Sequence, residues 1–239
     1  MIENFLKRGK RKAPYELNEK STIEKIDIKE GNKLKNEEKL SDAETQAFDI
    51  FTDTKENITP KIKTYLNKNN CRVYVYQNYL SKQESHALLD HCLKKIQWIH
   101  HTITVFDKEV FQPRLTCGMG TKHCYSKSMH PQAPWTEEVL KVQEKINKDM
   151  NTKFNSCLLN RYRNGNEYIA SHSDDKDHLS RNGIVAGISV GQERIIVLTE
   201  KKGDKKIKFL LPNGSLFVME GDTQEHWRHG IPKEIKESR

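Results

Sequence analysis

The chain has 239 residues, with 41 Lys or Arg, 33 Asp or Glu and a formal net charge of +8 at pH 7. This length suits one domain of ordinary size with an appendage. No apolar run approaches the ~20 residues of a membrane-spanning helix, and we expect neither a leader nor a membrane partner. The five cysteines are widely spaced, which argues against a disulfide framework or a cysteine zinc site.

Residues 1–68 are predicted to form a disordered charged tail. They are rich in Lys, Glu, Asn and Asp, and cannot bury enough apolar surface to offset the entropy cost of ordering. Within them, residues 5–14 (FLKRGKRKAP) form a basic cluster typical of nuclear-localisation or nucleic-acid-binding segments. A charged tail without a receptor explains the same residues, and both interpretations stay open. The interpretation as a nuclear-localisation segment predicts a nuclear protein, with the cytoplasm as a second location.

The predicted domain, residues 69–239, opens with a strand and a helix. Residues 71–80 (CRVYVYQNYL) are β-branched and aromatic, which favours a strand. In the helix predicted over 81–98, Ser81 and Glu84 form a capping box. Four residues are expected on its inward face: Ala87, Leu88, Cys92 and Ile96. A second helix is predicted over 133–150, capped by Thr136, with an inward face of Val139, Leu140, Val142 and Ile146.

After Phe154 the pattern changes to short strands separated by glycine-containing turns. The strands are expected at residues 156–163, 184–191, 194–200, 206–211 and 215–220. Helices followed by antiparallel strands predict an α+β fold, in which two N-terminal helices support a β-sandwich or jelly roll.

The segment 162–178 (YRNGNEYIASHSDDKDH) contains a candidate metal site. His172 and Asp174 are two residues apart and point to the same side of an extended backbone, although such a triplet is also common in solvated loops. Two histidines and one carboxylate leave three positions of Fe(II) open for a bidentate cosubstrate and dioxygen. Of the two later histidines, we expect His229 to be the third ligand, because the Gly-Ile-Pro turn after it lets the ring face inward. His226 is then a core or surface residue.

Three segments together resemble a known family: 105–120 (VFDKEVFQPRLTCGMG), 154–175 (FNSCLLNRYRNGNEYIASHSDD) and 214–234 (GSLFVMEGDTQEHWRHGIPKE). They are similar to the AlkB family of Fe(II)/2-oxoglutarate-dependent nucleic-acid dealkylases, specifically its eukaryotic DNA-repair members. The resemblance implies a double-stranded β-helix that holds iron through His172, Asp174 and His229, with 2-oxoglutarate as cosubstrate and O2 as co-reactant. It also implies that Asn160 and Tyr162 hydrogen-bond 2-oxoglutarate. Without it, both are alternating strand residues, with Tyr162 in the core.

The same resemblance assigns residues to a nucleic-acid interface. Asp175 matches an acidic position beside the flipped base, and Arg114 matches an arginine at the nucleic-acid surface. Phe106 matches a finger that fills the gap left by an extruded base, a role that recovers part of the stacking energy lost on flipping; from the sequence alone it is a buried strand residue. Tyr125 keeps one aromatic residue beside the base, whereas Lys127 replaces the aromatic residue that stacks on it.

The activity that the resemblance implies is oxidative demethylation of 1-methyladenine- and 3-methylcytosine-type bases in DNA, with RNA as a second substrate. The family's C-terminal strand, with its R-x-N-x-T-F-R pattern, has no match here. An arginine–carboxylate contact contributes about 1.5–3 kcal/mol, so its loss lowers cosubstrate affinity about 10-fold or more and leaves a sheet edge unpaired. A catalytically impaired nucleic-acid-binding relative is therefore the alternative. An oxygenase acting on protein or lipid is a third.

Partners follow from the charge and the tail. Net positive charge favours a polyanion, because Lys and Arg release counterions when they meet phosphates, although a solvated basic surface explains the charge equally well. Residues 4–8 (NFLKR) resemble a sliding-clamp-binding motif of repair relatives, without its leading basic residue and one aliphatic position. We expect a monomer with a weak clamp contact through this segment.

Overall fold

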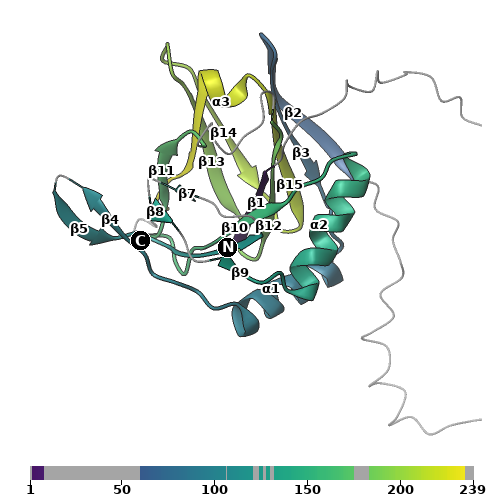
Figure 1. Ribbon diagram of the computed structural model, residues 1–239. Coiled ribbons are helices and arrows are strands. Elements are labelled where there is room, and N and C mark those ends of the chain that lie inside the picture. The colour runs from purple at the N-terminus through teal and green to yellow at the C-terminus, as the bar shows by residue number, and fades with distance from the viewer. Residues whose placement is uncertain are drawn as a thin grey trace, which may run out of the picture. The chain divides into compact units, whose positions relative to one another are not determined.

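Two β-sheets pack against each other through their apolar faces (Figure 1). The computed structural model describes residues 2–7, 60–105, 107–120, 124–125, 128–129, 132–174 and 183–234, which all belong to one compact unit. Over these residues the larger sheet has the strand order β2-β3-β15-β12-β1-β10-β6-β9, and the smaller has β11-β16-β13-β14. Neighbouring strands are antiparallel apart from the β6–β9 pair. This mostly antiparallel architecture is consistent with the predicted jelly roll.

The strands of the larger sheet are β1 (Ile2–Lys7), β2 (Lys61–Lys68), β3 (Cys71–Gln77), β6 (Leu115–Gly120), β9 (Gln132–Ala133), β10 (Ser156–Arg161), β12 (Val185–Val190) and β15 (Ser215–Gly221). Those of the smaller sheet are β11 (Ile169–His172), β13 (Arg194–Glu200), β14 (Lys206–Leu211) and β16 (Trp227–Ile231). Two short hairpins are β4 (Thr102–Val105) with β5 (Lys108–Phe111), and β7 (Cys124–Tyr125) with β8 (Ser128–Met129). The strands predicted after Phe154 are all present.

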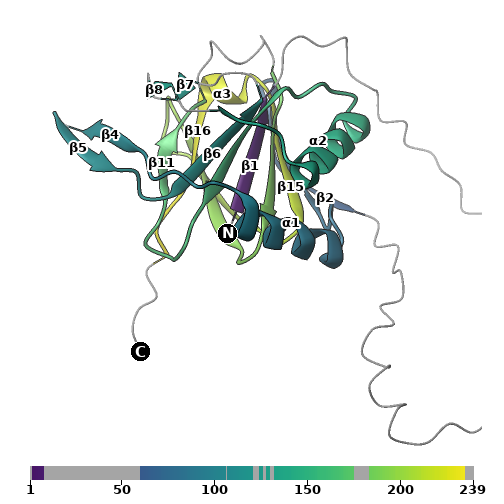
Figure 2. The ribbon, with the colours of Figure 1, turned by 60° about the horizontal axis from the view of Figure 1, so that its bottom comes forward.

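Helices α1 (Lys82–Lys95) and α2 (Glu137–Asp149) cover the outer face of the larger sheet (Figure 2). The predicted capping box of α1 is confirmed, because Ser81 and Glu84 each bond the other's backbone N–H. Ala87, however, is exposed, and Ser85 takes a buried position instead. Thr136 is the N-cap of α2 but makes no side-chain capping hydrogen bond.

A third helix, α3 (Thr223–His226), was not predicted, so the expectation of two supporting helices is incomplete. It is a single turn between β15 and β16, too short for an apolar period to show in the sequence. None of the helices in the described part of the chain is long and apolar enough to cross a membrane.

The structure differs from the predicted tail over residues 1–68 in two places. β2 forms a hairpin with β3, turning through Asn69 and Asn70, both of which have positive φ. β1, purple in Figure 2, pairs antiparallel with β10 on one side and β12 on the other. Residues 4–7 of the clamp-like segment therefore lie in a strand whose backbone is paired on both sides. Residues 8–59 lie outside the described part of the chain.

Candidate metal centre

The candidate ligands lie on two paired strands of the smaller sheet. β11 ends at His172, which is directly opposite His229 of β16, and Asp174 follows β11 by two residues. Their positions follow from the local sequence, since extended backbone places residues two apart on one side, and cross-strand pairing places opposite residues side by side. The structure thus brings together three residues that are far apart in the chain.

The three side chains converge closely enough to share one ion. One ligand atom from each of His172, Asp174 and His229 lies within 4.8 Å of the others. The imidazole centroids are 4.4 Å apart, and His172 Nε2 is 4.0 Å from Asp174 Oδ1. Two imidazoles and a carboxylate suit ferrous iron and leave coordination positions open. The donor set therefore fits the metal that the sequence implied.

Neighbouring groups orient two of these ligands. His172 Nδ1 lies 2.9 Å from the carbonyl oxygen of Ala170, a contact that suits an Nδ1–H donor and leaves Nε2 to face the metal position. Asp174 Oδ2 accepts a hydrogen bond from Gln224 Nε2 at 2.9 Å. Between the two ligands, Ser173 Oγ donates to the carbonyl of Trp227 at 3.0 Å. The end of β11 is thus fastened to α3 and β16.

Arg114 is not on a surface, which corrects the expectation that it contacts nucleic acid there. It is 4% exposed, and its Nε donates to Asn160 Oδ1 at 2.8 Å. The guanidinium charge also reaches His101, whose pKa is lowered first by burial and then by Arg114 and His100. A buried, hydrogen-bonded partner is what a guanidinium inside a protein requires, and the sequence after Pro113 contained no sign of it.

Asn160, a predicted cosubstrate ligand, is fully buried on β10. Because its Oδ1 accepts from Arg114, its Nδ2 is oriented as a donor, and that atom has no partner among the described residues. Two further buried groups, the hydroxyls Thr116 Oγ1 and Ser189 Oγ, also have no hydrogen-bond partner among the described residues. Thr116 is directly opposite Asn160, whereas Asn160 and Ser189 both lie opposite Glu3 of β1. Buried polar atoms without partners mark a ligand or water position, and sequence reasoning missed both hydroxyls.

Tyr162 connects the two sheets beside the candidate ligands. It is buried in a small apolar cluster with Ile169 of β11 and Ile231 of β16. The guanidinium of Arg194 lies 5.5 Å from its ring centroid. Tyr162 is thus a packed core residue, as the alternative interpretation expected. Its position next to the strands that carry His172 and His229 also suits a cosubstrate contact.

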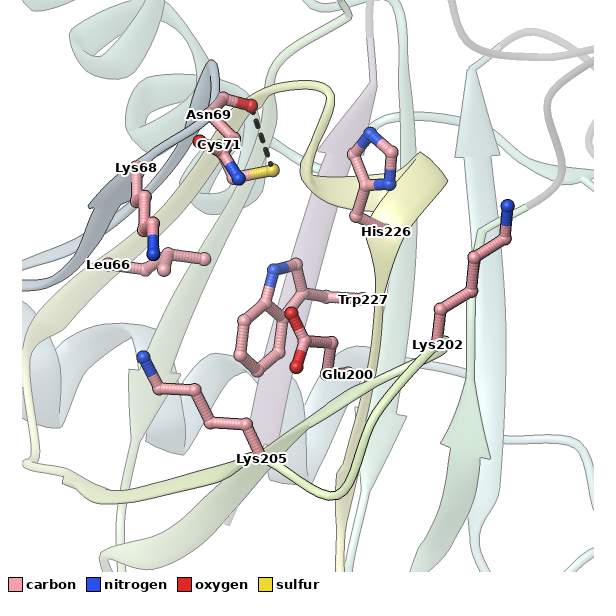
Figure 3. Close-up of a pocket in the computed structure, with 9 residues that line it drawn as sticks. All are labelled: Leu66, Lys68, Asn69, Cys71, Glu200, Lys202, Lys205, His226 and Trp227. Carbon is pink, nitrogen blue, oxygen red and sulfur yellow. Dashed lines mark hydrogen bonds between the residues drawn. The ribbon is translucent and has the colours of Figure 1, made fainter.

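His226 is not part of the group formed by His172, Asp174 and His229. It is exposed and lines a pocket of about 250 Å³, together with Trp227 and Glu200 (Figure 3). Glu200 is opposite Trp227, and Leu198 is opposite His229, so this pocket lies at the end of the sheet that carries the metal candidates. Three lysines also line it: Lys68, Lys202 and Lys205.

Phe106 and Asp175, both assigned to the nucleic-acid interface, lie outside the described residues. So does Lys127, which stands where the family has a stacking aromatic residue. Tyr125 lies in β7, and its backbone pairs with Ser128. The hairpin on either side of Phe106 is described: β4 and β5 pair with each other alone and extend beyond the sheets (Figures 1 and 2). Its Phe111 is 63% exposed, with its ring stacked on His100 at a centroid distance of 4.5 Å.

This fold and donor set have a counterpart among known proteins. Residues 72–239 match the 2OG-Fe(II) oxygenase superfamily, and the chain belongs to that superfamily. It is 32% identical over 174 residues to alpha-ketoglutarate-dependent dioxygenase alkB homolog 3 of Homo sapiens, a match that covers 68% of this chain and 61% of the relative. It is 33% identical over 194 residues to DNA oxidative demethylase ALKBH2 of Arabidopsis thaliana, covering 69% and 62%. The chain thus spans less than two thirds of the length of these relatives.

Proposed function

We propose that this chain demethylates N-alkylated bases of DNA oxidatively, using Fe(II), 2-oxoglutarate and O2. The observation that carries the proposal is the convergence of His172, Asp174 and His229 in a chain of the 2OG-Fe(II) oxygenase superfamily. Similarity to proteins named alkB homolog 3 and DNA oxidative demethylase ALKBH2 supports alkylated DNA as the substrate. By the same similarity, bases of the 1-methyladenine and 3-methylcytosine type are the proposed targets, with RNA as a second substrate.

The overall reaction balances without a further reductant. 2-Oxoglutarate loses CO2 and takes up one oxygen atom of O2 as it becomes succinate, while the other atom enters a C–H bond of the N-methyl group. The C–N bond then breaks, formaldehyde leaves, and the base nitrogen regains its proton. Bound iron supplies the site at which O2 is reduced. The three ligand side chains hold it and leave the remaining positions for the cosubstrate and O2.

The cosubstrate is proposed to lie against β10. Asn160 Nδ2 is a buried donor already oriented through the Arg114 contact, which suits a carboxylate oxygen as acceptor. Tyr162 lies beside the strands of the metal candidates. Thr116 and Ser189 add buried hydroxyls at the same level of the sheet as Asn160. Buried polar groups on one face of a sheet would orient 2-oxoglutarate and separate it from bulk water.

Nucleic acid is proposed to approach the end of the sheets where the metal candidates lie. The β4–β5 hairpin would present Phe106 as the wedge that replaces an extruded base, with Tyr125 and Asp175 beside that base. Lys68, Lys202 and Lys205, which line the pocket next to Trp227, add positive charge for phosphates. The protein is proposed to carry out these roles as a monomer in the nucleus.

The test measures succinate formation and base repair together. Purified protein is incubated with Fe(II), 2-oxoglutarate and oligonucleotides that carry 1-methyladenine or 3-methylcytosine. The expected result is coupled formation of succinate, formaldehyde and unmodified base, all abolished by Asp174→Ala. Succinate formation without repair would contradict the nucleic-acid substrate, and turnover that survives Asp174→Ala would contradict the site.

A nucleic-acid-binding protein without turnover is the second candidate, favoured by the net charge of +8. It predicts that the wild type binds the same oligonucleotides but forms no succinate. Binding and turnover measured on one preparation separate the two candidates.

A further inference from the structure

Gln224 contacts Asp174 at two points. Its side-chain Nε2 donates to Asp174 Oδ2 at 2.9 Å, and its Oε1 accepts from the backbone N–H of Asp174 at 3.0 Å. Both residues are buried, at 8% exposure each. An amide that uses its donor and its acceptor on one residue fixes both the backbone position and the rotation of that carboxylate.

The two oxygens of Asp174 consequently have different surroundings. Oδ2 is held by Gln224, whereas Oδ1 is the oxygen that lies 4.0 Å from His172 Nε2. A carboxylate oxygen that accepts a strong buried hydrogen bond is a poorer metal ligand than its neighbour, because the bond occupies one of its two lone pairs and withdraws electron density from that oxygen. One-oxygen ligation occupies one coordination position, and two-oxygen ligation would occupy an additional one.

The helix that carries Gln224 is itself held in place. Thr223 Oγ1 accepts from the backbone N–H of Arg72 at 3.1 Å, and Asp222 exchanges two hydrogen bonds with Asn70, each of 3.0 Å. Just before α3, Gly221 has a φ of +64°, and an added Cβ there would lie 1.9 Å from the carbonyl oxygen of Asn70. Only glycine permits this close approach.

Lys201 also holds Gln224 in place. Lys201 Nζ donates to the carbonyl oxygen of Gln224 at 2.8 Å, and the backbone N–H of Lys201 donates to the carbonyl of His226. Contacts from the β2–β3 turn and from the end of β13 therefore determine where the amide of Gln224 lies.

We propose that Gln224 is a positioning residue that holds Asp174 as a one-oxygen metal ligand and so keeps a coordination position open for the cosubstrate. The inference rests on the proposed function, because it requires a metal ion between His172, Asp174 and His229. Partners of metal ligands commonly change metal affinity about 10- to 100-fold when they are removed.

The experiment titrates Co(II) into the full chain and follows its visible absorption, which reports affinity and coordination number without turnover. Gln224→Met keeps the length of the side chain but removes the amide. We expect it to weaken Co(II) binding about 10- to 100-fold and to change the absorption, because both oxygens of Asp174 become available to the metal.

The matched control is Gln143→Met. Gln143 is also a buried glutamine, and its Nε2 donates to the carbonyl of Phe154, but it lies in α2 on the outer face of the larger sheet. This variant should lose thermal stability and keep the wild-type Co(II) affinity and spectrum. Ser173→Ala is a second control, because it loosens the ligand segment and leaves the Gln224 contacts intact.

The outcomes separate the two proposals. If the wild type binds no Co(II), or Asp174→Ala binds it equally well, the metal site itself is wrong. If Asp174→Ala loses binding but Gln224→Met keeps the wild-type affinity and spectrum, the role of Gln224 is wrong. Should Gln224→Met fail to fold, Gln224→Asn keeps an amide that is one methylene too short, and the same loss of affinity is expected.

Discussion

At the scale of single residues, one carboxylate holds the loop that leads into the first ligand strand. Glu167 accepts from the backbone N–H of Arg163 at 2.6 Å and from Arg163 Nε at 2.7 Å. Burial alone would raise the pKa of Glu167, but the side-chain and backbone hydrogen bonds from Arg163 outweigh burial and hold the pKa below its ordinary value. Since β11 begins two residues later, this pair fixes the approach to His172.

Glu167→Gln should lower the free energy of unfolding by about 1–2 kcal/mol at pH 7, toward the lower end because Arg163 is partly exposed. The folded-state pKa of Glu167 lies below its unfolded value, so its contribution is complete above pH 4.5 and is lost as the pH falls through the folded-state pKa. The free energies of unfolding of the two proteins, measured with urea at a series of pH values, should therefore approach each other as the pH falls. A constant difference at every pH would exclude the charged pair as the cause.

The extent to which the site could be predicted depends on how local each relation is. His172 and Asp174 are visible because their spacing is a property of extended backbone. His229 was chosen over His226 on the turn that follows it, but its position opposite His172 is a property of strand pairing that only the fold supplies. Burial of Arg114 against Asn160 and the contact of Gln224 with Asp174 join segments distant in the chain, so neither side chain differs in the sequence from an ordinary polar residue.

At the scale of elements, those with local sequence signals could be predicted, whereas those that depend on long-range strand pairing could not. The α1 capping box and strands β13 and β14 were predictable from turns and alternation. β1 was not, because its six residues belong to a charged segment of low hydropathy, and its strand depends on backbone groups offered by β10 and β12. Pairing on both sides satisfies the backbone N–H and C=O groups of β1, so β1 is part of the sheet that carries Asn160.

The register of β1 can be tested by a cross-strand disulfide. Leu6 is directly opposite Cys157, a free buried cysteine, and opposed residues of antiparallel strands lie within the Cα distance that a disulfide spans. Burial raises the pKa of the Cys157 thiol, so oxidation needs a catalyst during refolding. Leu6→Cys should form a disulfide with Cys157, detected by peptide mapping under non-reducing conditions.

Phe5→Cys is the control for this cross-link, because Phe5 is opposite Leu158 and Gly187 and has no cysteine across from it. It should remain reduced. Equal cross-linking of both variants, or of neither, would contradict the placement of β1.

At the scale of the whole molecule, positive charge and the candidate site occur together at one end of the sheets. Lys202 and Lys205 are exposed in the β13–β14 turn and line the pocket beside Trp227. Trp227 lies two residues before His229 in β16. The helices on the outer face of the larger sheet carry lysines too, but there Lys94 pairs with Asp90, and Lys141 with Glu137. Composition alone predicts the net charge and not this distribution, which depends on the topology.

Duplex DNA binding should therefore depend on salt through the lysines of the β13–β14 turn. For Lys202→Ala with Lys205→Ala, we expect the slope of log affinity against log salt to become shallower by about 1–2, at ~0.9 per lost phosphate contact. Lys94→Ala with Lys141→Ala removes the same charge from the helices and should leave the slope unchanged. Equal changes in the two double variants would show that net charge alone attracts DNA, and that the end of the sheets near His229 has no special part in binding.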